Sequence, residues 1–196
     1  MTKRLDIIKR ASYVLSIAAI GYTAWYLHFG KPWTNDGAIS AIGLEHRGLF
    51  IMWGVLVYAA LALSVFTAYR TFHKTWLYIP LLVACAVGMG LTLGCRFQYI
   101  QHTEYILHCI GSLVFSVTMS VNVFLLFLLG WKKHTIFKVF TGLTAFISLA
   151  DLALLCTVQE TGLIEAVPIA AGLAMLMIIN TGGEKFDAAR KAAKAR

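Results

Sequence analysis

The chain has 196 residues, of which 59% are hydrophobic and only 13% are charged, and its mean hydropathy is +0.75. Soluble domains contain about 25% charged residues, so this composition excludes most soluble classes and predicts an integral membrane protein. The formal net charge of +8 comes without a basic patch carrying interleaved aromatic residues, and we therefore expect no nucleic-acid partner.

The hydrophobic segments are long enough to be membrane-spanning helices. A hydrocarbon core about 30 Å thick requires about 20 apolar helical residues, because each residue rises about 1.5 Å. The segments are also too long for barrel strands and lack their alternation. We therefore predict an all-α fold, a bundle of six transmembrane helices. The six predicted spans are residues 11–29, 48–69, 77–95, 106–130, 136–157 and 163–181.

The first span begins after a basic segment, as a signal peptide does. It continues to Phe29 and is followed by Lys31, Pro32 and Trp33 instead of a small-residue cleavage site. We therefore expect it to remain in the protein as a helix.

The distribution of Lys and Arg predicts the orientation, because cytoplasmic loops retain most cations. Only Lys31, Arg47 and Arg96 lie in the loops on the opposite side. Both termini are therefore expected in the cytoplasm, in a plasma membrane of the bacterial inner-membrane type. The cytoplasmic cations are Lys3, Arg4, Lys9, Arg10, Arg70, Lys74, Lys132, Lys133, Lys138, Lys185, Arg190, Lys191, Lys194 and Arg196.

Small residues in the third span predict close helix packing. Ala86, Gly90 and Gly94 recur every four residues, and Ala84 and Gly88 form a neighbouring stripe. Small side chains let a second helix approach the backbone, so we expect this span to be central in the bundle. After the sixth span, residues 182–196 form a basic cytoplasmic tail that is expected to contact anionic lipid.

Polar groups within or beside spans are costly unless they are paired or face a cavity, so their positions are the best guide to function. They gather near the predicted outer face. We predict an outward-facing polar cavity that binds a lipid or an amphiphilic small molecule. Its predicted lining is Glu45, His46, Arg96, His108, Ser112 and Asp151.

The fourth span carries a polar seam. His108, Ser112, Ser116 and Ser120 recur every four residues and so lie along one slowly rotating stripe of the helix. One interpretation is that the seam lines the cavity. The alternative is that the serines bond to carbonyl groups of their own helix and that His108 serves a neighbouring loop.

The outer histidines permit a second hypothesis, a metal-dependent hydrolase. Its ligands would bind zinc, although none of them shows the four-residue spacing of a helical metal site. Haem b is disfavoured, because transfer across the membrane needs a second pair of histidines at another depth, and the sequence offers none. The candidate metal ligands are His46, His102, His108, Glu45 and Glu104.

The sequence leaves two interpretations open for Asp151, and two for the pair Cys95 and Cys109. Asp151 lies about 9 Å below the end of the fifth span. As an intramembrane carboxylate, it either serves the site or fixes helix register by pairing with Arg47, Arg96 or His108. Cys95 and Cys109 either form a disulfide across the hairpin of spans three and four or remain buried thiols.

The segment Glu160-Thr161-Gly162-Leu163-Ile164-Glu165-Ala166-Val167-Pro168-Ile169-Ala170-Ala171-Gly172, together with His108 at the start of the fourth span, resembles a family. This is the bacterial six-helix membrane family called domain of unknown function 998. That family is distantly similar to eukaryotic autophagy-modulator and growth-factor-receptor-activating membrane proteins. Where its pattern has a basic residue, this chain has Ala166. The resemblance extends over nearly the whole chain through helix order and implies six spans with a polar outer end, but no catalytic residues.

A third hypothesis is a structural or regulatory subunit, in which the glycine-rich third span packs on a membrane-protein partner or on a second copy of the chain. Transport has no support, because the spans lack Pro-interrupted, discontinuous helices. Pro32 lies in a loop, and Pro80 and Pro168 lie near the starts of their spans.

Overall fold

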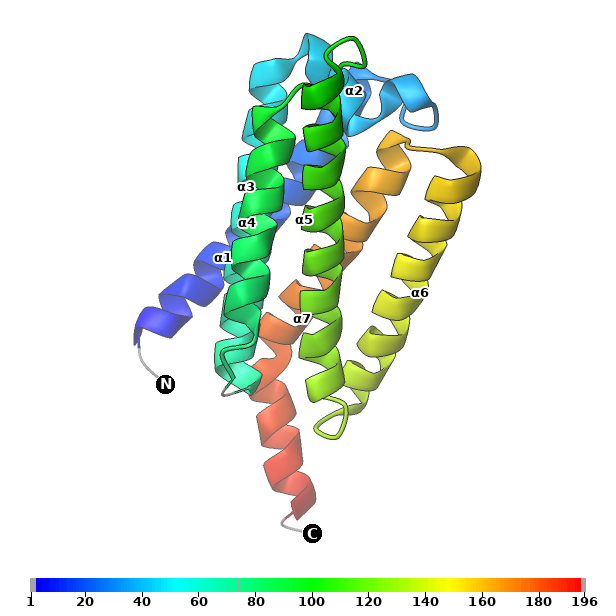
Figure 1. The fold of residues 1–196 in the computed structure, drawn as a ribbon. Coiled ribbons are helices and arrows are strands. Elements are labelled where there is room, and N and C mark those ends of the chain that lie inside the picture. Colours follow the sequence, from blue (N-terminus) through cyan, green and yellow to red (C-terminus); the bar gives the residue numbers. More distant parts are fainter. Residues whose placement is uncertain (1–2, 74, 195–196) are drawn as a thin grey trace.

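The computed structural model describes the backbone of residues 3–73 and 75–194 and the side chains of residues 5–73 and 75–182. These residues form an all-helical bundle without strands (Figure 1). The long helices are α1 (Lys3–Tyr26), α3 (Arg47–Phe72), α4 (Tyr78–Gly94), α5 (His102–Leu129), α6 (Thr135–Val158) and α7 (Gly162–Lys194). Two 3-10 turns, η1 (Leu27–Phe29) and η2 (Asn35–Gly37), and the short helix α2 (Ile39–Glu45) connect α1 to α3.

Four of these helices are long and apolar enough to cross a membrane: Arg47–Phe72, His102–Leu129, Thr135–Val158 and Gly162–Gly182. This confirms the prediction of an all-helical protein, and the length and composition of these four helices fit transmembrane helices. Helix α4 is equally apolar but shorter, with 17 residues. The predicted span at residues 77–95 therefore corresponds to a helix of about 26 Å.

The central helix of the bundle is α3, which packs against α1, α2, α4, α5 and α7. Buried polar contacts join it to its neighbours. The Ser16 hydroxyl lies 3.1 Å from that of Ser64, and the Asn180 side chain donates to the Ser64 carbonyl at 3.0 Å. The Trp53 indole N–H donates to the Thr23 hydroxyl at 3.0 Å. Such bonds replace those that water would make, so these hydroxyl and amide groups can be buried between apolar helices.

The prediction that span three is central was wrong, and of its two stripes of small residues the one with Gly90 and Gly94 makes no close contact. Gly90 and Gly94 are exposed, with no atom within 4 Å of a Cβ placed there. Gly88, from the neighbouring stripe, makes the close contact. It packs against Gly111 of α5 so tightly that a Cβ on Gly88 would lie 2.8 Å from the Gly111 carbonyl oxygen. The four-residue spacing identifies stripes of small residues but not which stripe faces the neighbour.

The two ends of the bundle differ. Helix α1 begins and α7 ends toward one end, whereas α2, the α4–α5 loop and the α6–α7 turn gather at the other (Figure 1). We call the latter the α2 end. Its connections are tied together: the Asn35 amide donates to the Gln159 side chain at 2.9 Å, and the Leu163 N–H donates to the Pro32 carbonyl at 2.9 Å. These bonds fix the α1–α2 connection against the start of α7.

The Gly88–Gly111 contact predicts a position-specific effect on stability. In G88A, the new methyl group would lie 2.6 Å from the Phe115 backbone nitrogen. Backbone has little freedom to move away, so we expect a loss of about 1–3 kcal/mol in the free energy of unfolding. The matched control G90A meets no atom within 4 Å and should be neutral or gain up to about 1 kcal/mol from helix propensity. Unfolding in SDS–detergent mixed micelles measures both, and equal stability of the two variants would contradict the prediction.

His73, at the end of the bundle away from α2, predicts a pH-dependent stability. Its Nε2 bonds to the Leu126 carbonyl at 3.0 Å, and the Lys133 ammonium lies 3.4 Å from its Nδ1. Burial, and then the Lys133 charge, lower the pKa of His73 from 6.5 to about 4. Between these two values the unfolded chain binds a proton that the folded chain does not, so stability falls as the pH drops from 6.5 to 4.

We expect this group to contribute about 1–2 kcal/mol to that fall, since one pKa unit corresponds to about 1.4 kcal/mol and water screens the half-buried ring. Thermal unfolding across this pH range should show a shallower slope for H73Q than for the wild type. The control H28Q, at an exposed histidine, should keep the wild-type slope. An unchanged slope in H73Q would refute the assignment.

Candidate functional site

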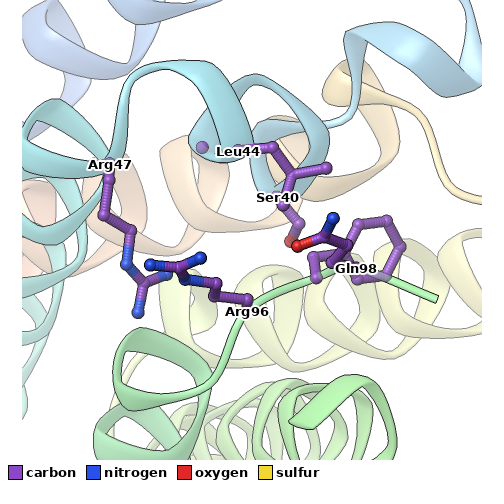
Figure 2. A pocket seen from close by; sticks show the side chains of 7 residues that line it. Ser40, Leu44, Arg47, Arg96 and Gln98 are labelled. Carbon is purple, nitrogen blue, oxygen red and sulfur yellow. The ribbon is translucent and has the colours of Figure 1, made fainter. Parts of the chain in front are cut away.

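A hollow of about 250 Å³ opens at the α2 end of the bundle. We call it the arginine pocket. Its walls come from α2, from the first residue of α3 and from the loop between α4 and α5. In Figure 2 the guanidinium groups of Arg47 and Arg96 lie beside each other, and Ser40 lies near Gln98. The lining residues are Ser40, Gly43, Leu44, Arg47, Arg96, Phe97 and Gln98.

The two arginines are held differently. Arg47 donates from Nη1 to the Cys95 carbonyl at 3.3 Å and from Nη2 to the Leu93 carbonyl, so it satisfies carbonyl groups at the C-terminal end of α4. The Arg96 side chain is exposed and makes no hydrogen bond to a described residue. Neither guanidinium forms an ion pair with a described carboxylate. Within the described residues, two positive charges therefore face one hollow without an ion-pair partner.

Ser40 joins this pocket to a buried chain of hydrogen bonds. Its Oγ lies 3.1 Å from Oε1 of Glu165 on α7 and 3.1 Å from Nε2 of His108 on α5. The other ring nitrogen of His108 lies 3.2 Å from the Cys95 carbonyl oxygen. Glu165 also accepts a hydrogen bond from the Ile39 N–H, the first of α2. One chain of bonds thus connects α7, α2, α5 and the α4–α5 loop.

The chemistry of the atoms restricts where the hydrogens lie. A carbonyl oxygen only accepts, so Nδ1 of His108 carries a hydrogen toward Cys95. With a neutral ring, Nε2 accepts from the Ser40 hydroxyl, and a protonated Glu165 donates to Ser40. With a charged ring, Nε2 donates to Ser40, and the Ser40 hydroxyl donates to an ionised Glu165. Both arrangements contain the same number of hydrogens, so a proton can pass between Glu165 and His108 through Ser40 without any change in net charge.

The surroundings of this chain combine low polarity with further charged groups. The His108 side chain is 1% exposed and lies between the rings of Phe50 and Phe97, whose centroids are 6.0 and 5.2 Å away. The Glu160 carboxyl in the α6–α7 turn adjoins that of Glu165. Such carboxyl pairs commonly share a proton, because two charges at close range repel each other.

The structure distributes the six predicted lining residues over several places. Arg96 lines the arginine pocket, and His108 reaches it through Ser40. Glu45 is exposed at the end of α2, and His46 packs its ring against Phe29, with the centroids 4.7 Å apart. Ser112 is half-buried one turn beyond His108 and makes no hydrogen bond to a described residue.

Asp151 lies on α6, away from the arginine pocket. It continues the face of α6 that Phe137, Thr141 and Thr144 bury, because it follows Thr144 by seven residues. The carboxyl is half-buried and forms no ion pair or hydrogen bond with a described residue. The structure thus shows none of the pairings expected with Arg47, Arg96 or His108.

The candidate metal ligands do not converge. Within the described side chains, no three His, Cys, Asp or Glu residues lie close enough together to hold a metal ion. His102 is exposed beside Tyr99, and Glu104 accepts from the Arg96 backbone N–H at 3.2 Å. Cys95 and Cys109 are both free thiols.

Sequence reasoning missed Ser40 and the role of Glu165. Ser40 lies in a stretch of small residues that looks like a connecting loop, and helix α2 is too short to show a hydrophobic period. Glu165 was visible as an acidic residue at the start of a span. The available signal was the Glu165 carboxyl group in the first turn of an apolar helix, because a carboxyl group in that place requires a hydrogen-bond or ion-pair partner.

Comparisons with known proteins give no relatives: the chain matches no family model, no curated protein and no solved structure. The resemblance to the domain 998 family therefore stays a prediction.

Proposed function

We propose that the chain crosses a bacterial inner membrane six times, with both termini in the cytoplasm and the arginine pocket at the outer face. Four apolar helices and the shorter α4 support five of the spans. The sixth is α1, which packs along α3 and whose apolar part follows a basic beginning. Twelve of the fourteen Lys and Arg residues predicted to be cytoplasmic belong to the described backbone, and they lie toward the end away from α2, as expected of a cytoplasmic side.

We further propose that the protein binds the anionic headgroup of a membrane lipid or similar amphiphile in the arginine pocket. The observation that carries this proposal is the pair of guanidinium groups, Arg47 and Arg96, that face one hollow and form no ion pair with a carboxylate among the described residues. Guanidinium groups form strong, charge-assisted hydrogen bonds with phosphate and carboxylate oxygens. A pocket at the end of a membrane bundle also lies at the depth of lipid headgroups.

Arg47 and Arg96 have different roles in the proposed binding of the headgroup. Arg47 is held in place by carbonyl groups at the end of α4, whereas the Arg96 side chain makes no hydrogen bond to a described residue and can donate to a ligand. Arg47 supplies a fixed positive charge, and Arg96 can adjust to the anion. The amphiphile's apolar part would remain in the surrounding lipid, so that the pocket needs to enclose only the headgroup.

The proposed orientation predicts which loops can be labelled from outside. K31C and K132C place thiols at two exposed positions on opposite ends of the bundle. In intact cells, a membrane-impermeant maleimide should label K31C above the wild-type background and should label K132C only after permeabilisation. Labelling of K132C in intact cells would contradict the orientation.

The proposed binding predicts a selective effect of Arg96. R96Q should reduce retention of phosphatidylglycerol by the purified protein about 10-fold or more, since a hydrogen bond to a charged group contributes about 1.5–3 kcal/mol. Native mass spectrometry with phosphatidylglycerol, and with phosphatidylcholine for comparison, measures the bound fraction. K31Q removes an exposed cation from the same end of the bundle and should bind as the wild type does. Equal losses in R96Q and K31Q would show that only diffuse charge attracts the lipid.

A further inference from the structure

Ser40 has the surroundings of a nucleophilic serine. Its Oγ lies 3.1 Å from Nε2 of His108, within the range expected between a nucleophile and its general base. The Cys95 carbonyl oxygen lies 3.2 Å from Nδ1 and fixes a hydrogen there, so that in the neutral ring Nε2 presents its lone pair to Ser40. A hydroxyl group, a base and a group that orients the base thus lie in sequence.

This dyad adjoins the arginine pocket. Ser40 is one of the lining residues, although only 3% of its surface is exposed, and His108 lies behind it. Arg96 and Gln98 supply N–H groups to the same hollow. These groups are the donors available to stabilise negative charge that develops on a substrate oxygen. The residue that carries the nucleophile therefore borders the place where the headgroup is proposed to bind.

We propose that the Ser40–His108 dyad hydrolyses a carboxylic ester of an anionic lipid. The substrate class rests on the proposed function, because the two arginines select the anion, whereas the nucleophile rests on the dyad alone. In a glycerophospholipid the acyl esters lie a few bonds from the phosphate. A phosphate held by Arg47 and Arg96 therefore brings an ester into the neighbourhood of Ser40.

The reaction balances with water as the only co-reactant. Ser40 Oγ attacks the ester carbonyl carbon while its proton passes to His108 Nε2. The bond between the carbonyl carbon and the alcohol oxygen then breaks, and the alcohol leaves with the proton from Nε2. Water attacks the acyl-serine and gives a proton to Nε2, the acyl–Oγ bond breaks, and Oγ recovers that proton. The products are a fatty acid and a lysolipid.

Glu165 acts on this step as a positioning residue. It bonds to the Ile39 N–H and the Ser40 hydroxyl, and so it fixes the start of α2 relative to His108. In the arrangement with a neutral ring, its proton points at Ser40 Oγ and leaves the serine hydroxyl directed at Nε2. That is the reactive form of the dyad.

A fluorophosphonate probe tests the nucleophile without reference to any lipid. Attack by Ser40 on its phosphorus atom expels fluoride and leaves a stable adduct, which mass spectrometry assigns to a peptide. We expect one adduct, on Ser40 of the wild-type protein. H108Q should form it at least about 10²-fold more slowly, as expected for loss of a general base. The controls H102Q, at an exposed histidine of the same helix, and S112A should label at the wild-type rate.

Absence of an adduct on Ser40, or an adduct that forms equally fast in H108Q, would overturn the proposal. The lipid reaction is measured separately, as release of fatty acid from phosphatidylglycerol vesicles containing the wild-type protein. Release that is lost in S40A but kept in S112A supports the dyad, and no release by the wild type refutes hydrolysis of this substrate class. Lipid retention by the wild-type protein reports headgroup binding, whereas fluorophosphonate labelling reports the dyad, so failure of headgroup binding and failure of the dyad give different results.

Discussion

The hydrogen-bonded chain from Glu165 through Ser40 to His108 organises the α2 end of the bundle. Helix α2 has only seven residues, too few to be stable in isolation. Its first N–H is bonded by the Glu165 carboxyl of α7, and its second residue is held by α7 and α5 together. Among the described residues, no other hydrogen bond connects α2 to α5 or α7. The pocket wall formed by Ser40, Gly43 and Leu44 depends on them.

A second constraint, the C-terminal end of α4, places the positive charge. Helix α4 ends at Gly94, and the carbonyl groups of its last turn need donors. Arg47, at the start of α3, supplies two of them across the interface. The carbonyl of Cys95 then serves both Arg47 and His108. One loop residue therefore sets the position of a pocket arginine and the tautomer of the buried histidine.

Much of the fold follows from the sequence, because the membrane imposes length and polarity on each helix. The segments predicted at 48–69, 136–157 and 163–181 fall within helices long enough to span, and the segment 106–130 extends one residue beyond such a helix. Rotation about the helix axis is not encoded in this way. Gly88 and Gly90 are equally small, yet only Gly88 meets another backbone. Which of them does so depends on side chains of α5 that are distant in sequence.

The same difference, between helix length, which the sequence encodes, and helix packing, which it does not, explains why only part of the candidate site was predicted. Arg96 and His108 were found because charged or titratable groups near apolar spans are conspicuous, whereas Ser40 is an ordinary hydroxyl in a short connection. Its significance arises only when α5 and α7 bring His108 and Glu165 to within 3.1 Å. The serines of the polar seam on α5 are the opposite case to Ser40, because they are conspicuous in the sequence. They share a stripe with His108 in sequence, but 100° of rotation per residue turns each successive one a further 40° around the helix.

Asp151 shows the limit of treating every intramembrane carboxyl as part of one site. The sequence predicted Asp151 at about the same depth in the membrane as the cations of the α2 end. In the structure, α6 joins the bundle mainly through Phe137 and Phe140, which lie near its first residues. Beyond Asp151, residues 152–158 are exposed on every side of the helix. A helix held at one end leaves its other end exposed. The carboxyl group therefore has no cation within reach, whereas Glu165, at the start of a helix packed on α2 and α3, has three polar neighbours. Packing of the helix that carries an acidic residue, more than its depth, decides whether that residue belongs to the site.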